Sequence, residues 1–311
     1  GNSMAKTRWG IISTGGIANF FAEGLTHVED AELVAVGSRT QASADAFGDK
    51  WNVPRRYDSY QALVDDPDVD AVYIGTPHNY HRDNAIMAIE AGKAVLCEKP
   101  FAVNYDEAKA MVDLARAKGV FLMEAMWTRF LPAYVKIREL LAAGAIGEVR
   151  MVQADFCFDA DYDPKHRLFN PDLAGGAMLD VGIYPIAFAY MVLGEPQQVT
   201  GTAIKAPTGV DEHSCYMFQY EGGVTAMLSS SVGTRAPVEA KIIGTKGYIK
   251  VPQPFFNARR FVLARHGGES EFIYEGKIFD EELIEVPTVG VGYNYEAAAV
   301  GQYLRDGKTE S

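Results

Sequence analysis

Cysteine is scarce in this sequence. The 311 residues include three cysteines, Cys97, Cys157 and Cys215, which are far apart and form no C-x-x-C pair. The sequence therefore offers neither a disulfide framework nor the ligand spacing of a structural zinc site. We expect a protein of the reducing cytoplasm that uses no metal ion.

Long apolar runs and positive charge are also in short supply. No run approaches the roughly 20 apolar residues of a membrane-spanning helix, and no signal peptide is visible. The chain carries 29 Lys and Arg against 41 Asp and Glu, which gives a net charge of −12 at pH 7. Because nucleic-acid binding needs a basic surface, we expect neither a nucleic acid nor a membrane as partner.

From Met4 to residue 124 the sequence alternates short apolar runs with helical patterns. The apolar runs are continuous, which is typical of a parallel sheet covered by helices on both faces. They occupy residues 10–13, 32–37, 70–75, 94–97 and 120–123. This alternation predicts an α/β nucleotide-binding domain over residues 4–124.

After residue 124 the pattern changes. Polar and apolar residues alternate within five segments, which predicts an antiparallel sheet with one face in solvent. The segments are residues 149–156, 199–204, 214–220, 224–231 and 238–243, and a mostly apolar helix is predicted at 178–193. Residues 125–311 are therefore expected to form an α+β domain. Residues 305–311 contain no closing element, so we expect the chain to stop without a final helix.

A glycine turn follows the first apolar run. The fingerprint G-x-G-x-x-G/A begins at Ser13 and ends at Ala18, with its first glycine replaced. A helix that starts after such a turn offers N–H groups and partial positive charge to a pyrophosphate. A strand–turn–helix that binds no nucleotide remains the alternative. The residues expected to contact the cofactor here are Ser13, Thr14, Gly15, Gly16 and Ile17.

The second apolar run ends at Ser38-Arg39-Thr40. An NAD-selective domain usually has an acidic residue at this place to bind the ribose 2′-hydroxyl. Here there is none, and the Arg39 guanidinium suits a phosphate instead. We therefore predict NADP rather than NAD as cofactor, bound through Ser38 and Arg39. The alternative is an exposed arginine in a loop.

Polar residues follow three further strands, where an open α/β sheet binds its ligands. The predicted cofactor contacts at these strand ends are Thr76, Pro77, His78, His81, Glu98 and Lys99. Trp127 and Arg129 are predicted to line the substrate pocket, with a core tryptophan and a surface arginine as the alternatives. In the apolar segment 177–186, Asp180 and Tyr184 are four residues apart, so they share one face of a helix.

These motifs resemble those of the glucose–fructose oxidoreductase/inositol dehydrogenase (Gfo/Idh/MocA) superfamily. The motifs are the glycine turn, Glu98-Lys99-Pro100 after a strand, and Asp180-Val181-Gly182 in a helix. Residues 8–11, 96–100, 121–130 and 175–184 are similar to its dimeric dihydrodiol dehydrogenase branch, which includes NADP-dependent xylose dehydrogenases. Many members of the superfamily have histidine at the position of Tyr184, whereas this branch has tyrosine.

The resemblance implies a Rossmann domain followed by an α+β domain with a large, open, mostly antiparallel sheet. It further implies a homodimer formed through that sheet, no metal, and a substrate that is a sugar, a polyol or a trans-dihydrodiol. The activity it implies is NADP-dependent hydride transfer to or from a secondary alcohol or hemiacetal carbon. Tyr184 would act as the base, Lys99 would favour its phenolate and bind the substrate oxygen, and Asp180 would hold the substrate or Lys99.

Two other functions remain open. A non-catalytic NADP-binding sensor would keep the glycine turn and Arg39 but would not need Lys99 or Tyr184, and both are present. An enzyme that retains its nucleotide and oxidises its substrate only transiently would keep all of these residues. Release of NADPH into solution distinguishes the dehydrogenase from both.

Overall fold

The computed structural model describes residues 5–267 and 279–311. The chain divides into two compact units, and it passes between them twice. The first unit comprises the residues up to 127 together with 289–311, and the second comprises residues 128–288. The first passage lies close to the predicted boundary after residue 124, and the second was not predicted.

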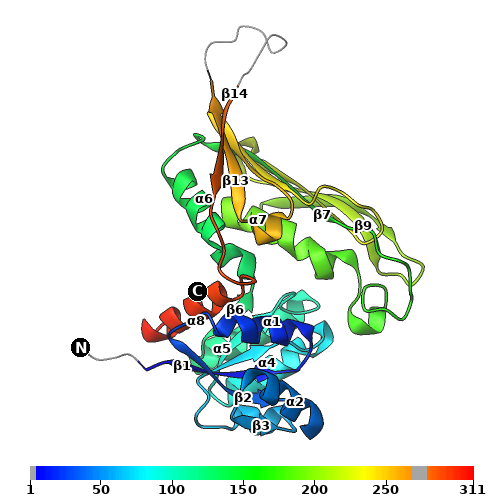
Figure 1. Ribbon diagram of the computed structural model, residues 1–311. Helices are drawn as coiled ribbons and strands as arrows, with labels where there is room; N and C mark the ends of the chain where they lie inside the picture. Colours follow the sequence, from blue (N-terminus) through cyan, green and yellow to red (C-terminus); the bar gives the residue numbers. More distant parts are fainter. Residues whose placement is uncertain (1–4, 268–278) are drawn as a thin grey trace. The chain divides into compact units, whose positions relative to one another are not determined.

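The first unit is a parallel sheet with helices on both faces (Figure 1). Its strand order is β3-β2-β1-β4-β5-β6, so the order reverses between β1 and β4, where sheets of this kind bind ligands. The strands are β1 Thr7–Ile12, β2 Ala31–Gly37, β3 Arg55–Tyr57, β4 Ala71–Ile74, β5 Ala94–Glu98 and β6 Leu122–Ala125. The helices are α1 Gly16–Leu25, α2 Gln41–Trp51, α3 Tyr60–Val64, α4 His81–Glu90, α5 Tyr105–Lys118 and α8 Asn294–Arg305.

The continuous apolar runs are buried on both faces of this sheet. In β4 and β5, Val72, Ile74, Val95 and Leu96 have no exposed surface. The helix ends follow local sequence signals. The Asn104 side chain accepts the Glu107 N–H at 2.9 Å and so begins α5, and Gly119, with φ +64°, ends it.

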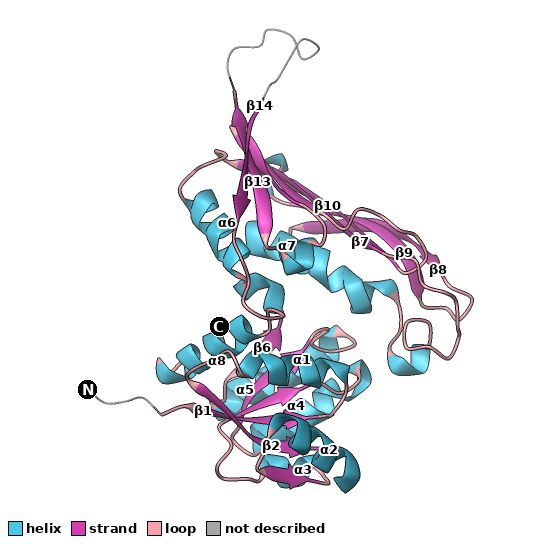
Figure 2. Cartoon of the chain, viewed as in Figure 1, coloured by secondary structure: helices cyan, strands magenta, loops and turns pink. Residues whose placement is uncertain are grey.

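The second unit is an eight-stranded sheet in the order β14-β13-β12-β11-β7-β10-β9-β8. Strands β7 and β10 pair in parallel, and all its other neighbouring strands pair antiparallel. The strands are β7 Val149–Cys157, β8 Gln198–Lys205, β9 Asp211–Gln219, β10 Thr225–Ser231, β11 Ala240–Gly244, β12 Gly247–Val251, β13 Arg260–His266 and β14 Phe279–Glu285. Helices α6 (Pro132–Ala142) and α7 (Ile183–Leu193) cover one face of the sheet, and the other face is bare of any helix that the structure describes (Figure 2).

The structure corrects the expectation that the chain lacks a closing helix. Helix α8 packs against α1, where a Cβ on Gly24 would lie 2.9 Å from the backbone nitrogen of Asn294. Ala297 and Val300 are buried in this contact. The sequence signal was weak because the buried face of α8 consists largely of small residues, which mark a helix face poorly.

One helical stretch of the described residues, Pro171–Leu193, is long and apolar enough to cross a membrane by length and composition alone. It is not one regular helix. It joins a short 3₁₀ turn, a π-helical turn and α7, and Ala174 within it has φ +55°. Half of its most apolar window is buried, and α7 packs on β7 and β10, as the core helix of a sheet does.

Candidate active site

The glycine turn has the geometry of a phosphate cradle. Ser13 adopts φ +103°, a conformation that glycine favours and that the missing first glycine of the fingerprint would have supplied. Gly15 precedes α1 with no side-chain cap, and the first turn of α1 carries no acidic residue. A Cβ on Gly16 would meet no atom of the described residues within 4 Å. The N–H groups and positive end of α1 therefore face open space, which fits a dinucleotide pyrophosphate.

The segment after β2 places the Arg39 side chain at the strand end that is expected to bind the ribose of the cofactor. Ser38 is buried and donates its N–H to the Tyr57 carbonyl oxygen at 3.0 Å, while Thr40 caps α2 by accepting the Ser43 N–H at 3.2 Å. Arg39, between them, is exposed. Burial raises the pKa of the Tyr60 hydroxyl, and the charge of Arg39 opposes this shift. The arrangement fits a 2′-phosphate, because no carboxylate occupies this strand end.

His81 has a structural role that the sequence did not reveal. The side chain has no exposed surface, and its two ring nitrogens lie 2.8 Å from the carbonyl oxygens of Thr76 and Pro100. The ring therefore joins the ends of β4 and β5 and has no nitrogen left for a cofactor. The Thr76 hydroxyl is likewise turned inward and donates to Asn84 at 2.7 Å. Contact of Thr76 and His81 with the cofactor remains a prediction, and these bonds show that both side chains also hold the strand ends together.

Glu98, whose contact with the cofactor remains a prediction, also has partners within the protein. Its carboxylate is buried, accepts a hydrogen bond from the Tyr73 hydroxyl, and accepts the Lys99 N–H at 3.1 Å. The side chain points into the first unit because it lies at the last position of a strand whose faces are both covered. Its acceptor atoms serve the protein itself.

Lys99 follows β5 and is half-buried beside two acidic residues. Its positive charge lowers the pKa of both Glu98 and Glu124, against the larger effect of burial, which raises both. Glu124 accepts the Phe101 N–H at 3.0 Å and so holds the segment that follows Lys99. The turn that bears Lys99 is thus fixed by hydrogen bonds on either side. His78 and Pro77 lie at the neighbouring strand end, in and just before a short 3₁₀ turn.

In the second unit, Asp180 and Tyr184 lie on one continuous helical segment, as predicted. The segment begins with a π-helical turn, Met178–Gly182, rather than with the α-helix expected over 178–193. Pro185 explains the difference in part, because it has no N–H to bond the carbonyl four residues earlier. The wider turn also packs closely on β10, where a Cβ on Gly182 would lie 2.9 Å from the Ser230 hydroxyl.

Asp180 forms an ion pair with Arg167, a residue that sequence reasoning missed. The helical segment is anchored at its start by Asp211, which accepts the Met178 N–H at 2.7 Å. Gly176, with φ +114°, allows this approach, since a Cβ there would overlap Asp211. Arg167 gave no sequence signal because it is a single arginine in a loop.

The Tyr184 ring lies against an aromatic wall. Its centroid is 5.5 Å from that of Phe156 and 5.3 Å from that of Phe256, and those two rings stack at 4.6 Å. Phe256 is held by its backbone, because its carbonyl oxygen accepts the Thr128 hydroxyl at 2.6 Å. Neither phenylalanine was predicted, since nothing in an alternating strand or a loop distinguishes a wall of a site from ordinary core.

The two predicted substrate-pocket residues have different environments. Trp127 stacks on Tyr293 in the first unit, with ring centroids 4.7 Å apart. Arg129 is exposed in the second unit, and its carbonyl oxygen accepts a hydrogen bond from Arg138 at 2.8 Å. Contact of either side chain with a substrate remains a prediction.

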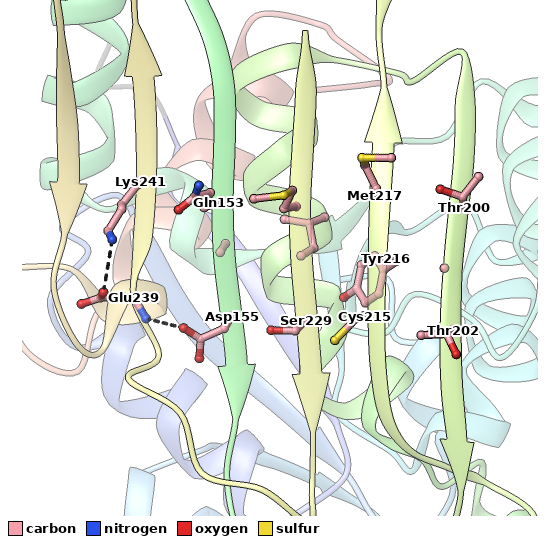
Figure 3. Close-up of a pocket in the computed structure, with 14 residues that line it drawn as sticks. Gln153, Asp155, Thr200, Thr202, Cys215, Tyr216, Met217, Ser229, Glu239 and Lys241 are labelled. Atoms are coloured by element: carbon pink, nitrogen blue, oxygen red, sulfur yellow. Dashed lines mark hydrogen bonds and ion pairs between the residues drawn. The ribbon is translucent and has the colours of Figure 1, made fainter. Parts of the chain in front are cut away.

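The bare face of the second sheet holds a shallow hollow of about 510 Å³ (Figure 3). Strands β7 to β11 contribute outward-pointing side chains to it, among them Met217, Met227 and Cys215. Its charged rim includes Lys241, which lies 3.8 Å from the carboxylate of Glu239. Among the described residues, the hollow thus combines apolar and polar side chains on the sheet face opposite α7.

Comparison with known proteins settles the family. A model described as an oxidoreductase family with an NAD-binding Rossmann fold matches residues 7–126, and a Gfo/Idh/MocA C-terminal domain model matches residues 134–250. The chain is 38% identical to trans-1,2-dihydrobenzene-1,2-diol dehydrogenase of Mus musculus, an alignment that covers 98% of this chain and 90% of the mouse protein. The chain belongs to the Gfo/Idh/MocA family. The enzyme of the same name from Xenopus tropicalis is also 38% identical, over 98% of this chain and 91% of its own.

Two solved structures share the fold. A 3-ketoreductase from Actinomadura kijaniata, in complex with NADP and TDP-benzene, superposes with a TM-score of 0.81 at 25% identity, covering 97% of this chain and 90% of its own. A levoglucosan dehydrogenase in complex with NADH and L-sorbose gives a TM-score of 0.87 at 20% identity, with 99% and 91% covered. The second likeness concerns the fold alone.

For this Gfo/Idh/MocA protein the predicted fold class, family and enzyme class are therefore confirmed. It is an oxidoreductase that uses a nicotinamide dinucleotide and acts on CH–OH groups. Its first unit carries the dinucleotide cradle and Lys99, and its second carries Asp180 and Tyr184.

Proposed function

We propose that the chain is an NADP-dependent dehydrogenase whose substrate is a secondary alcohol on a ring, in a trans-dihydrodiol, a sugar or a polyol. The observation that carries the proposal is the placement of Tyr184 beside Asp180 on one helical segment and against the Phe156–Phe256 wall. A phenol supplies a proton acceptor, a carboxylate supplies a hydrogen-bond acceptor, and the wall suits a flat or apolar ring face. The relatives named as dihydrodiol dehydrogenases support the same substrate class.

In this proposal the bound nicotinamide accepts or supplies the hydride. Tyr184 takes the proton of the reacting hydroxyl. A free tyrosine titrates near pH 10, so a neighbouring positive charge is needed to favour its phenolate, and Lys99 is the residue we assign to this task. Asp180, held by Arg167, accepts a hydrogen bond from the substrate and orients the reacting carbon.

A substrate screen tests the proposal. Purified enzyme with NADP is mixed with trans-1,2-dihydrobenzene-1,2-diol, with D-xylose or with an inositol, and NADPH is followed by its absorbance. We expect NADPH to accumulate with at least one of them. A regulatory protein would bind NADPH without forming any, and an enzyme with a retained nucleotide would turn over substrate at constant absorbance. Either result would contradict the proposal.

Preference for NADP over NAD is tested by Arg39→Ala. The guanidinium is the one charged group of the Ser38–Thr40 segment, so its loss should weaken NADP binding by about 10- to 100-fold, the usual value of a hydrogen bond to a charged group. Binding of NAD, which has no 2′-phosphate, should stay within about 3-fold. Fluorescence titration with NADPH and NADH measures both. Equal losses for the two cofactors would show that Arg39 does not bind the 2′-phosphate.

We also propose that the chain forms a homodimer through the bare sheet face, in the reducing cytoplasm. Met227 is 47% exposed on this face, and Ile204 on β8, whose register partner is His213, is 61% exposed. An uncovered sheet face with exposed apolar side chains is a typical interface. Met227→Glu should therefore convert dimers to monomers in analytical ultracentrifugation. Tyr105→Glu, at a position that is 75% exposed in the first unit, is the matched control and should leave the dimer intact.

A further inference from the structure

Three ionisable side chains lie buried together in the first unit, on elements that are far apart in the sequence. Tyr73 on β4 and Glu296 on α8 have no exposed surface, and Glu98 at the end of β5 is 5% exposed. The Tyr73 hydroxyl donates to Oε2 of Glu98, whose Oε1 accepts the Lys99 N–H at 3.1 Å. Neither carboxyl oxygen of Glu296 accepts a hydrogen bond from the described part of the chain.

Two carboxyl groups in one buried region cannot both be ionised at low cost, because each loses hydration and each repels the other. Burial raises the pKa of Glu98 to about 7, although the charge of Lys99 and the Tyr73 hydrogen bond lower it. Burial, and then the charge of Glu98, raise the pKa of Glu296 well above its ordinary value. The pair therefore keeps at least one proton at neutral pH.

The groups that act on the Glu98–Glu296 pair and on Tyr73 come from several elements of the first unit. Lys99 and Glu124 act on Glu98 from the turn after β5 and from β6, with opposite effects on its pKa. Tyr293, which precedes α8, acts on Tyr73, whose own pKa burial raises well above its ordinary value. Burial, and then the charges of Glu98 and Glu124, raise the pKa of the neighbouring Cys97 thiol well above its ordinary value. Among the described residues, Lys99 is thus the cation whose charge lowers the pKa of Glu98.

We propose that Glu98 is a positioning residue whose carboxylate, held by Tyr73 and packed in one buried cluster with Glu296, fixes the turn that presents Lys99. The inference rests on the proposed function, in which Lys99 takes part in proton transfer. An ionised Glu98 accepts from both Tyr73 and the Lys99 backbone and attracts the Lys99 ammonium. A protonated Glu98 has no charge and its oxygens are weaker acceptors, so Lys99 is held less firmly. Turnover should then fall as pH falls through the neutral range.

The first test compares pH profiles of kcat. Tyr73→Phe removes a donor to the ionised carboxylate, so the acid limb should move up by about 1 pH unit. Glu98→Gln should abolish the limb and lower kcat, while the KM for NADP stays unchanged. Tyr134→Phe is the matched control, because Tyr134 is also fully buried but donates to a backbone oxygen, that of Phe255, at 2.6 Å. It should leave the limb where it is.

The second test does not depend on activity. A carboxyl whose pKa is higher in the folded than in the unfolded chain loses stability as pH rises from about 4.5 to its folded pKa. The melting temperature of Glu98→Gln relative to wild type should therefore rise by about 3 °C or more from pH 5 to pH 7 and then level off. That of Glu296→Gln should continue to rise above pH 7.

The two tests separate the failures. If the wild type forms no NADPH with any substrate, the proposed function fails, while the melting curves still decide whether Glu98 and Glu296 keep a proton. If the difference in melting temperature between each glutamine variant and the wild type does not change with pH, the raised pKa values of Glu98 and Glu296 are ruled out. An acid limb that stays in place in Tyr73→Phe, or that moves equally in Tyr134→Phe, would overturn the positioning role of Glu98.

Discussion

Replacement of Tyr184 by phenylalanine is expected to lower kcat by about 10³-fold, within the range that general acid–base catalysis contributes. The variant keeps the ring that packs against Phe156 and Phe256, so the aromatic wall and the fold should survive. Binding of NADPH should not change, because Tyr184 lies outside the unit that carries the dinucleotide cradle. Steady-state kinetics and a fluorescence titration provide the two measurements.

Tyr190→Phe is the control for this prediction. Tyr190 lies on the same helix, α7, and its ring contacts Phe218 edge-on, but its side chain is 46% exposed. Its turnover should match that of the wild type. If Tyr184→Phe retains turnover within a few-fold while NADP still binds, another group accepts the proton and Asp180 becomes the next candidate.

Replacement of Lys99 by methionine is expected to lower kcat/KM by about 10²-fold or more, because the charge that favours the phenolate and the donor to the substrate oxygen are lost together. Lys99→Arg should restore part of the activity, since it keeps the charge but not the geometry. Lys99→Met should also raise the pKa of Glu98 further, because Lys99 is the group whose charge lowers this pKa most. Kinetics at fixed pH and melting curves from pH 5 to pH 8 measure the two effects.

Lys93→Met is the matched control for Lys99→Met. Lys93 lies just before β5, where its ammonium donates to the carbonyl oxygens of Asp66 and Val69 at 2.7 and 2.8 Å. Its loss should lower the melting temperature without a specific loss of turnover. Comparable losses of turnover in the two variants would mean that Lys99 acts through stability alone.

The sequence was most informative where burial is complete. The continuous apolar runs around Val72 and Val95 predicted a parallel sheet because a strand covered on both faces has no place for polar residues. Once that sheet is inferred, its strand ends identify the ligand edge, which indicated Lys99, while the cradle at Gly15 and Gly16 followed from the glycine fingerprint. Arg39 was predicted from the absence of an acid together with the fit of its guanidinium to a phosphate.

The sequence was less informative where a polar side chain is buried. Glu98 and His81 follow strands that end at the ligand edge, and only the structure shows that their polar atoms form hydrogen bonds within the first unit. The burial of Glu296 could not be predicted from the sequence, because a single acidic residue beside alanines is typical of a helix face in solvent. Arg167 and Phe256 come from loops, whose spatial neighbours depend on tertiary packing that no local pattern encodes.

The return of the last residues to the first unit has a consequence for how the protein is made. Tyr293 stacks on Trp127, and the buried face of α8 closes the core beside α1. The amino-terminal half therefore lacks part of its own interior until residues 293–305 have been synthesised. Its core is completed only after the second unit has been made, and the incomplete core is the species that chaperones would meet during synthesis.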